Sequence, residues 1–74
     1  SVKIYPNPTK SHLNIENLTP RKITSITVYD HLGKQVFSSI STNKISVNNL
    51  EIGVYFLELK FYNSETVIKR FIKN

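Results

Sequence analysis

Apolar and polar residues alternate most regularly in the last third of the chain, from Gly53 onward. Successive side chains of a β-strand point to opposite faces, so this period of two predicts a strand over residues 53–62. One of its faces is wholly apolar and requires a second layer to cover it. That face carries Tyr55, Leu57, Leu59 and Phe61, and the opposite face carries Phe56, Glu58, Lys60 and Tyr62.

The pattern continues into a second strand after a turn predicted at Asn63-Ser64, which makes residues 65–73 the return strand of an antiparallel hairpin. In this strand both faces are mixed. Val67 and Phe71 share one face, Ile68 and Ile72 share the other, and basic residues lie among them. The strand is therefore predicted either to pair deep inside the fold or to leave one face for a partner.

Shorter alternating segments fill the rest of the chain and predict five further strands, at residues 2–5, 12–16, 24–30, 34–39 and 45–47. No segment has a helical period of useful length. Seven short strands at regular spacing predict an all-β fold, a β-sandwich of two antiparallel sheets. Its predicted inner positions are Ile4, Leu13, Ile15, Ile26, Val28, Val36, Ile45, Val47, Leu50, Tyr55, Leu57 and Leu59.

Turn residues separate these strands. Pro6 and Pro8 lack backbone donors and end the first strand, and Asn7 between them is biased to an extended conformation. Asp30 and Gly33 suit a type I turn followed by a residue with positive φ. In the polar turn before the long strand, Leu50 is predicted to close the bottom of the core and Gly53 to take a positive φ. Residues 38–43 are predicted to be a loose connection.

The chain has 74 residues, enough for one domain with a thin core. Such a domain has a stability on the order of 3–5 kcal/mol. It contains no cysteine, so no disulfide supports it, and no methionine, from which we expect one module, residues 1–74, at the C-terminus of a larger protein. The longest apolar run, 54–57, is too short to span a bilayer, so no transmembrane segment is predicted.

The chain is basic, with ten Lys and Arg against five Asp and Glu and a net charge of +5. On charge alone, nucleic acid, acidic glycan and anionic membrane are candidate partners. The basic residues are spread out, with one concentration at Lys69, Arg70 and Lys73, which is typical of a solvated strand that discourages edge pairing. Nucleic-acid binding is disfavoured because the chain lacks both a basic stripe on one strand and the glycine-aromatic cluster of an RNA-binding sheet.

Residues that could carry out catalysis are scarce. Asp30 is the only aspartate, and its neighbour His31 lies in the same predicted turn, so the two side chains should diverge. His12, His31, Asp30 and Glu16 have no recognisable metal-ligand spacing. We therefore predict no enzymatic activity, no metal and no cofactor. A carbohydrate-binding or adhesive module of a secreted hydrolase remains an alternative, because Tyr5, Tyr29, Phe56 and Tyr62 could stack on sugars, although period-two aromatics without tryptophan favour packing. A passive fibronectin-like spacer is a second alternative.

Three blocks, in order, give the chain a family resemblance. The first comprises Tyr5-Pro6-Asn7-Pro8-Thr9, Leu13-Asn14-Ile15 and residues 26–36 with Asp30, Gly33 and Lys34; the second is 45–57, with Leu50, Gly53 and Tyr55; the third is 67–73. Together they resemble a type A C-terminal sorting domain of the type IX (Por) secretion system, over the whole chain. Asn74 after the last lysine, and Glu51-Ile52 before the glycine, depart from the family pattern.

The resemblance implies a seven-stranded Ig-like sandwich with Greek-key connections. It also implies a sorting signal: an N-terminal cargo domain in the same chain would cross the periplasm and be carried by the type IX translocon to the cell surface or medium. Outer-membrane shuttle and sortase proteins would be further partners, and a sortase-like peptidase would usually remove the domain. The residues that the resemblance assigns to translocon recognition are Lys69, Arg70, Phe71, Ile72 and Lys73. We expect surface docking or strand addition by a receptor at this last strand.

Overall fold

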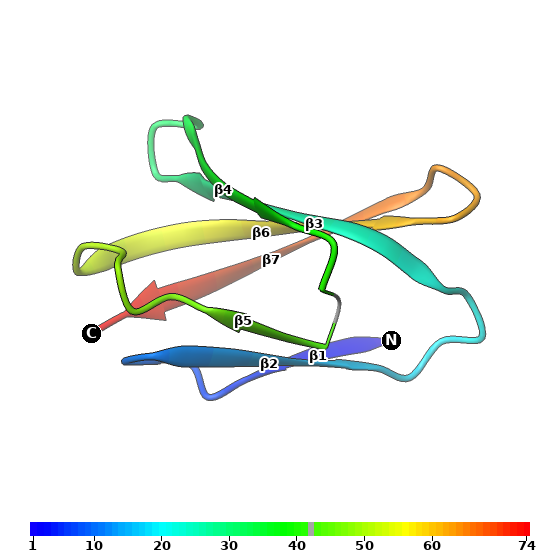
Figure 1. Ribbon diagram of the computed structural model, residues 1–74, viewed down its shortest axis with the longest axis horizontal. Coiled ribbons are helices and arrows are strands. Elements are labelled where there is room, and N and C mark those ends of the chain that lie inside the picture. Colours follow the sequence, from blue (N-terminus) through cyan, green and yellow to red (C-terminus); the bar gives the residue numbers. More distant parts are fainter. Residues whose placement is uncertain (42) are drawn as a thin grey trace.

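The computed structural model describes residues 1–41 and 43–74, and over these residues the chain forms seven β-strands and no helix (Figure 1). Position 42, in the predicted connection 38–43, lies outside the described residues. The strand boundaries agree with the sequence pattern to within two residues. The strands are β1 (Val2–Tyr5), β2 (His12–Asn17), β3 (Ile23–Asp30), β4 (Gln35–Ser39), β5 (Lys44–Ser46), β6 (Gly53–Phe61) and β7 (Thr66–Lys73).

The strands form two layers, which Figure 1 shows one above the other. One sheet has the order β1-β2-β5 and the other the order β4-β3-β6-β7, and all strand pairings are antiparallel. In Ig-like sandwiches the first, second and fifth strands share one sheet, and the third, sixth and seventh share the other. The predicted β-sandwich is therefore confirmed, with β4 added beside β3.

The core lies between the sheets and is built largely from the alternate positions that the pattern selected. Ile23, which the pattern did not select, joins it beyond a register shift between Ile23 and Ser25. The apolar face of β6 is buried along its whole length, as predicted. Ile4 and Leu50 are partly buried and pack against the core, which confirms their assignment. The fully assembled core comprises Val2, Leu13, Ile15, Ile23, Ile26, Val28, Ile45, Val47, Tyr55, Leu57, Leu59, Phe61 and Phe71.

The prediction for β4 was wrong at Val36, which is 38% exposed, whereas Phe37 packs against the core. The reason is a β-bulge. The register between β3 and β4 shifts between Val28 and Tyr29, and this shift places Phe37 opposite the inward-facing Val28. A bulge inserts one extra residue and so exchanges the two faces of the strand beyond it.

The β3–β4 turn has the predicted geometry. The Gly33 N–H donates to the Asp30 carbonyl at 3.0 Å, and Gly33 has a φ of +82°. The carboxylate oxygen Oδ1 of Asp30 accepts the N–H groups of Leu32 and Lys34, both at 2.9 Å. These bonds, the one from Lys34 foremost, lower the pKa of Asp30 below its ordinary 3.8 because they stabilise the charged carboxylate. Asp30 and Gly33 are thus structural residues of the turn.

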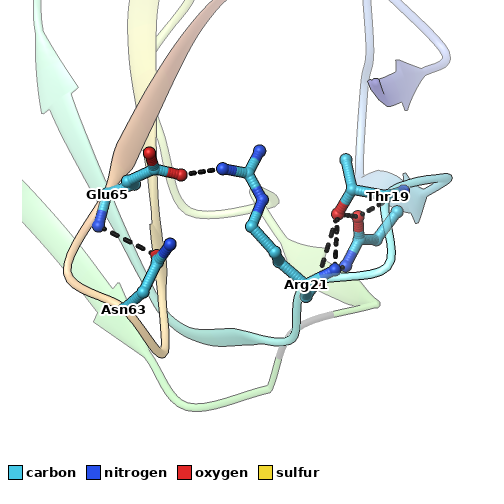
Figure 2. Close-up of polar contacts among 5 residues, drawn as sticks. Thr19, Arg21, Asn63 and Glu65 are labelled. Atoms are coloured by element: carbon cyan, nitrogen blue, oxygen red, sulfur yellow. Dashed lines mark hydrogen bonds and ion pairs between the residues drawn. The ribbon is translucent and has the colours of Figure 1, made fainter.

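At the opposite end of the molecule, Arg21 joins the loop after β2 to the β6–β7 turn (Figure 2). Its guanidinium pairs with the Glu65 carboxylate and lies 4.6 Å above the centre of the Phe61 ring. The Thr19 hydroxyl fixes the Arg21 backbone by accepting its N–H at 3.2 Å and donating to its carbonyl at 3.1 Å. Asn63 Oδ1 accepts the Glu65 N–H at 3.2 Å and orders the turn. The start of β7 is therefore held in place.

Candidate recognition surface on the final strand

β7 is an edge strand of the four-stranded sheet and pairs with β6 over its whole length, from Lys60 opposite Thr66 to Gly53 opposite Lys73. The first alternative predicted for it, pairing deep inside the fold, is wrong, because the strand lies at the edge of its sheet. One face is covered by the core and the other carries exposed side chains, which is the arrangement that the second alternative describes. A partner could therefore reach some residues of β7 and not others, depending on the face on which each side chain lies.

The inward face of β7 serves the fold. Phe71 is fully buried, and its ring stacks on that of Tyr55 with the ring centres 5.6 Å apart and an angle of 21° between the planes. Lys73 is only 7% exposed, and its Nζ donates to the Asn74 carbonyl at 3.2 Å. Val67 and Lys69 continue this face and are half-buried. Two of the five predicted recognition residues, Phe71 and Lys73, are thus largely shielded from a partner.

The outward face of β7 carries Thr66, Ile68, Arg70 and Ile72. Ile68 is 61% exposed, Arg70 is exposed, and Ile72 is half-buried. Of the predicted residues, the structure therefore brings Arg70 and Ile72 together on the surface. The sequence prediction omitted Ile68, although its spacing of two and four residues from Arg70 and Ile72 was the signal that could have identified it.

The outward face of β7 extends across the sheet. Arg70 lies opposite Phe56 of β6, and Phe56 lies opposite Tyr29 of β3. The Tyr29 hydroxyl donates to Glu58 Oε1 at 3.3 Å, and partial burial, then the Glu58 charge and this bond, raise the pKa of Tyr29. We call this set the outer patch: Tyr29, Val54, Phe56, Glu58, Ile68, Arg70 and Ile72. It is a largely apolar sheet face that also carries Glu58 and, on the edge strand, Arg70.

The C-terminal half of the β7 edge is covered by the turn between β1 and β2. The Asn7 side chain behaves like a short piece of strand: Nδ2 donates to the Arg70 carbonyl at 3.1 Å, and Oδ1 accepts the Ile72 N–H at 2.9 Å. Thr9 continues the pairing, because its N–H donates to the Ile72 carbonyl at 2.9 Å and its carbonyl accepts the Asn74 N–H at 2.8 Å. We call this segment, Asn7 to Thr9, the latch.

Asn7 lies between two prolines, Pro6 and Pro8. β1 ends at Tyr5, directly before Pro6, as predicted, and the peptide bonds preceding Pro6 and Pro8 are both cis. Thr9 is 1% exposed, and its hydroxyl donates to the His12 carbonyl. Asn7 and Thr9 therefore fasten the last strand, a role that the sequence alone did not suggest.

The second block also has a structural role. The hydroxyl of Tyr55 donates to the Glu51 carbonyl at 2.7 Å across the turn before β6. Burial raises the pKa of Tyr55, and the charges of Glu51 and Asp30 add to the effect. Gly53 has a φ of +159°, positive as predicted but close to the extended limit. These contacts fix the turn that contains Leu50, which packs against the core.

The candidate chemical groups are dispersed. His31 lies beside Asp30 in the exposed β3–β4 turn, whereas His12 begins β2 in the other sheet. Over residues 1–41 and 43–74, no three His, Cys, Asp or Glu side chains gather as a metal site would require.

A hollow of about 350 Å³ lies beside the latch, and Lys10, His12 and Lys44 are among its lining residues.

The aromatic residues proposed for sugar stacking are dispersed as well. Tyr5 belongs to the three-stranded sheet, and Tyr62 follows the end of β6. Tyr29 and Phe56 are half-buried neighbours in the outer patch. The described part of the chain has no helix of the length and apolarity needed to cross a membrane.

The chain is thus a small antiparallel β-sandwich whose final strand carries apolar and basic side chains on its outward face. A family model described as "Secretion system C-terminal sorting domain" matches residues 3–74, and the chain belongs to this family, the C-terminal sorting domains of type IX secretion. No curated protein matches the chain. The family is one of sorting signals and not of catalysts, and it implies a protein that is secreted to the cell surface or medium.

Proposed function

We propose that the type IX translocon recognises this domain in the periplasm and carries the attached cargo across the outer membrane. The cargo would precede Ser1 in the same chain, and outer-membrane shuttle and sortase proteins would act on the domain in turn. A sortase-like peptidase would then remove it. The family match over residues 3–74 is the observation that carries this proposal.

The geometry of β7 supports two different roles, direct contact and support of the strand, for the five residues assigned to recognition. Arg70 and Ile72 face outward and would contact the translocon directly. Phe71 and Lys73 face the core and would act by holding the strand in shape. Lys69 is half-buried on the inward face of an edge strand, where its long side chain can reach the rim and offer its charge to a partner.

The test is an export assay. The chain is fused to a fluorescent protein that carries a Sec signal and is expressed in a host with a type IX system. We expect fluorescence at the surface or in the medium, and retention when the host lacks the translocon. An intact fusion that stays in the periplasm of the competent host would contradict the function. Binding of the fusion to a glycan array would favour the carbohydrate-binding alternative.

Point variants test the residues better than a deletion of 69–74, which would also remove Phe71 from the core. Arg70→Ala with Ile72→Ala alters only the outward face, and we expect it to reduce export about tenfold or more, the effect of losing about 1.4 kcal/mol of binding. Val36→Ala is the matched control, because Val36 is exposed on β4 at the other edge of the same sheet. Equal export of both variants would contradict the assignment of Arg70 and Ile72.

A further inference from the structure

The backbone of β7 has an open half whose hydrogen-bonding groups can be identified from the latch. The latch binds the Arg70 carbonyl, the N–H and carbonyl of Ile72, and the Asn74 N–H. The backbone N–H and C=O groups of even-numbered β7 residues therefore point away from β6. Because backbone direction alternates along a strand, the backbone groups of Thr66 and Ile68 and the N–H of Arg70 point the same way. Among the described residues, no backbone group pairs with them.

We propose that an extended segment of the export receptor adds to the sheet at Thr66–Arg70 and hydrogen-bonds these outward-facing groups, an inference that rests on the proposed function. The added strand would stop at Arg70, because its carbonyl is already bound by Asn7. Strand addition takes its affinity from main-chain hydrogen bonds and its specificity from alternate side chains. Those side chains would lie next to Ile68, which is 61% exposed and belongs to the outer patch.

Other features of β7 favour this edge over the opposite one. β7 has eight residues, whereas the other edge strand of the sheet, β4, has five. Both ends of β7 are anchored, by Arg21 with Glu65 at the start and by the latch at the end. A strand held at both ends needs little further ordering when a partner binds, which lowers the entropic cost of association.

The charge of the chain indicates what kind of segment would bind. Lys69 and Arg70 lie at the open half, and the whole chain has a net charge of +5. A second copy of the chain would bring two basic strands together, and like charges across a strand pair are destabilising. The occupant is therefore a receptor segment with acidic or uncharged side chains beside Lys69 and Arg70.

Proline substitution tests the main-chain bonds, because proline has no N–H and is tolerated on strand edges whose N–H faces solvent. Ile68→Pro removes one of the proposed donors. The matched control is Ser38→Pro on β4. The backbone N–H and C=O groups of even-numbered β6 residues point toward β3, so those of Ile26 and Val28 in β3 point toward β4. Their partners Ser39 and Phe37 direct their backbone groups back toward β3. The N–H of Ser38, between them, therefore points outward at the opposite edge of the sheet.

In the export assay we expect Ile68→Pro to lower export at least tenfold and Ser38→Pro to export like the parent fusion. Wild-type export of Ile68→Pro would overturn the strand-addition inference and leave the sorting function standing, whereas failure of the parent fusion itself would count against the function. Protease resistance of each fusion shows whether it has folded.

Photo-crosslinking gives a second test if Ile68→Pro does not fold. A benzoylphenylalanine is placed at position 68 or, as the control, at position 38 of the exported fusion. We expect an adduct with a type IX component, identified by mass spectrometry, from position 68 and not from position 38. Equal adducts from both positions, or none at 68 in a fusion that is exported, would overturn the inference.

Discussion

The latch makes a quantitative prediction for Asn7→Ala. The Asn7 side chain makes two hydrogen bonds to β7, of 3.1 Å to the Arg70 carbonyl and 2.9 Å from the Ile72 N–H. A hydrogen bond contributes a net 0.5–1.5 kcal/mol or so, which gives about 1–3 kcal/mol for two. Because Asn7 is exposed and water can replace part of what is lost, we expect the lower half of that range, about 1–2 kcal/mol.

This loss would be a large share of a total stability on the order of 3–5 kcal/mol. Equilibrium unfolding in urea measures it. With a denaturant slope of about 1 kcal/mol/M, the unfolding midpoint should fall by about 1–2 M with the slope unchanged. Amide hydrogen exchange should accelerate at Ile72, whose N–H loses its partner, and remain slow at Phe71, which faces β6.

Two further variants serve as controls. Asn7→Asp keeps the acceptor for Ile72 but sets a carboxylate oxygen against the Arg70 carbonyl, so it should be no more stable than Asn7→Ala. Asn63→Ala removes one exposed bond of 3.2 Å to the Glu65 N–H and should cost about 0.5 kcal/mol. A stability of Asn7→Ala within about 0.3 kcal/mol of the wild type would refute the latch as a stabilising contact.

Other substitutions test the turns and the core. Because the pKa of Asp30 is lowered in the folded state, its carboxylate stabilises the fold above pH 3.8, and this stabilisation is lost as pH falls through the lowered pKa. Asp30→Asn should therefore lose less stability in acid than the wild type, as measured by the midpoints of urea unfolding. Gly33→Ala, at a φ of +82°, should cost about 1 kcal/mol, and Ser64→Gly, at a φ of +71°, should stabilise the fold. Thermal unfolding measures both changes. Phe71→Ala, fully buried, should cost about 3–5 kcal/mol and abolish the cooperative unfolding transition.

The sequence predicted those parts of the fold in which local pattern and tertiary packing agree. In β6 every second residue is apolar, and all of them are buried between the sheets. Asp30 and Gly33 determined a turn because the geometry is local to five residues. The pattern failed at Val36 and Phe37, two adjacent apolar residues of which either could face inward. The bulge beside Val28 determines that Phe37 faces inward, and no feature of the β4 sequence indicates that bulge.

The candidate site was harder to predict because its two halves are far apart in the sequence. Asn7 is 63 and 65 positions from Arg70 and Ile72, and an asparagine between prolines indicates only a turn. In β7 both faces carry two apolar residues, so the alternation alone could not say which one packs. Stacking of Phe71 on Tyr55 settles the choice, and it depends on the pairing of β6 with β7.

The predicted recognition residues 69–73 lie alternately on the two faces of β7, so one linear segment combines two separate requirements. Mild substitutions at Phe71 or Lys73, such as Phe71→Leu, should reduce export through lost stability and should be partly rescued by a stabilising change elsewhere, such as Ser64→Gly. Substitutions at Arg70 or Ile72 should reduce export in a folded domain and resist that rescue. If both groups respond alike to Ser64→Gly, the two faces of β7 do not have the separate roles that their burial indicates.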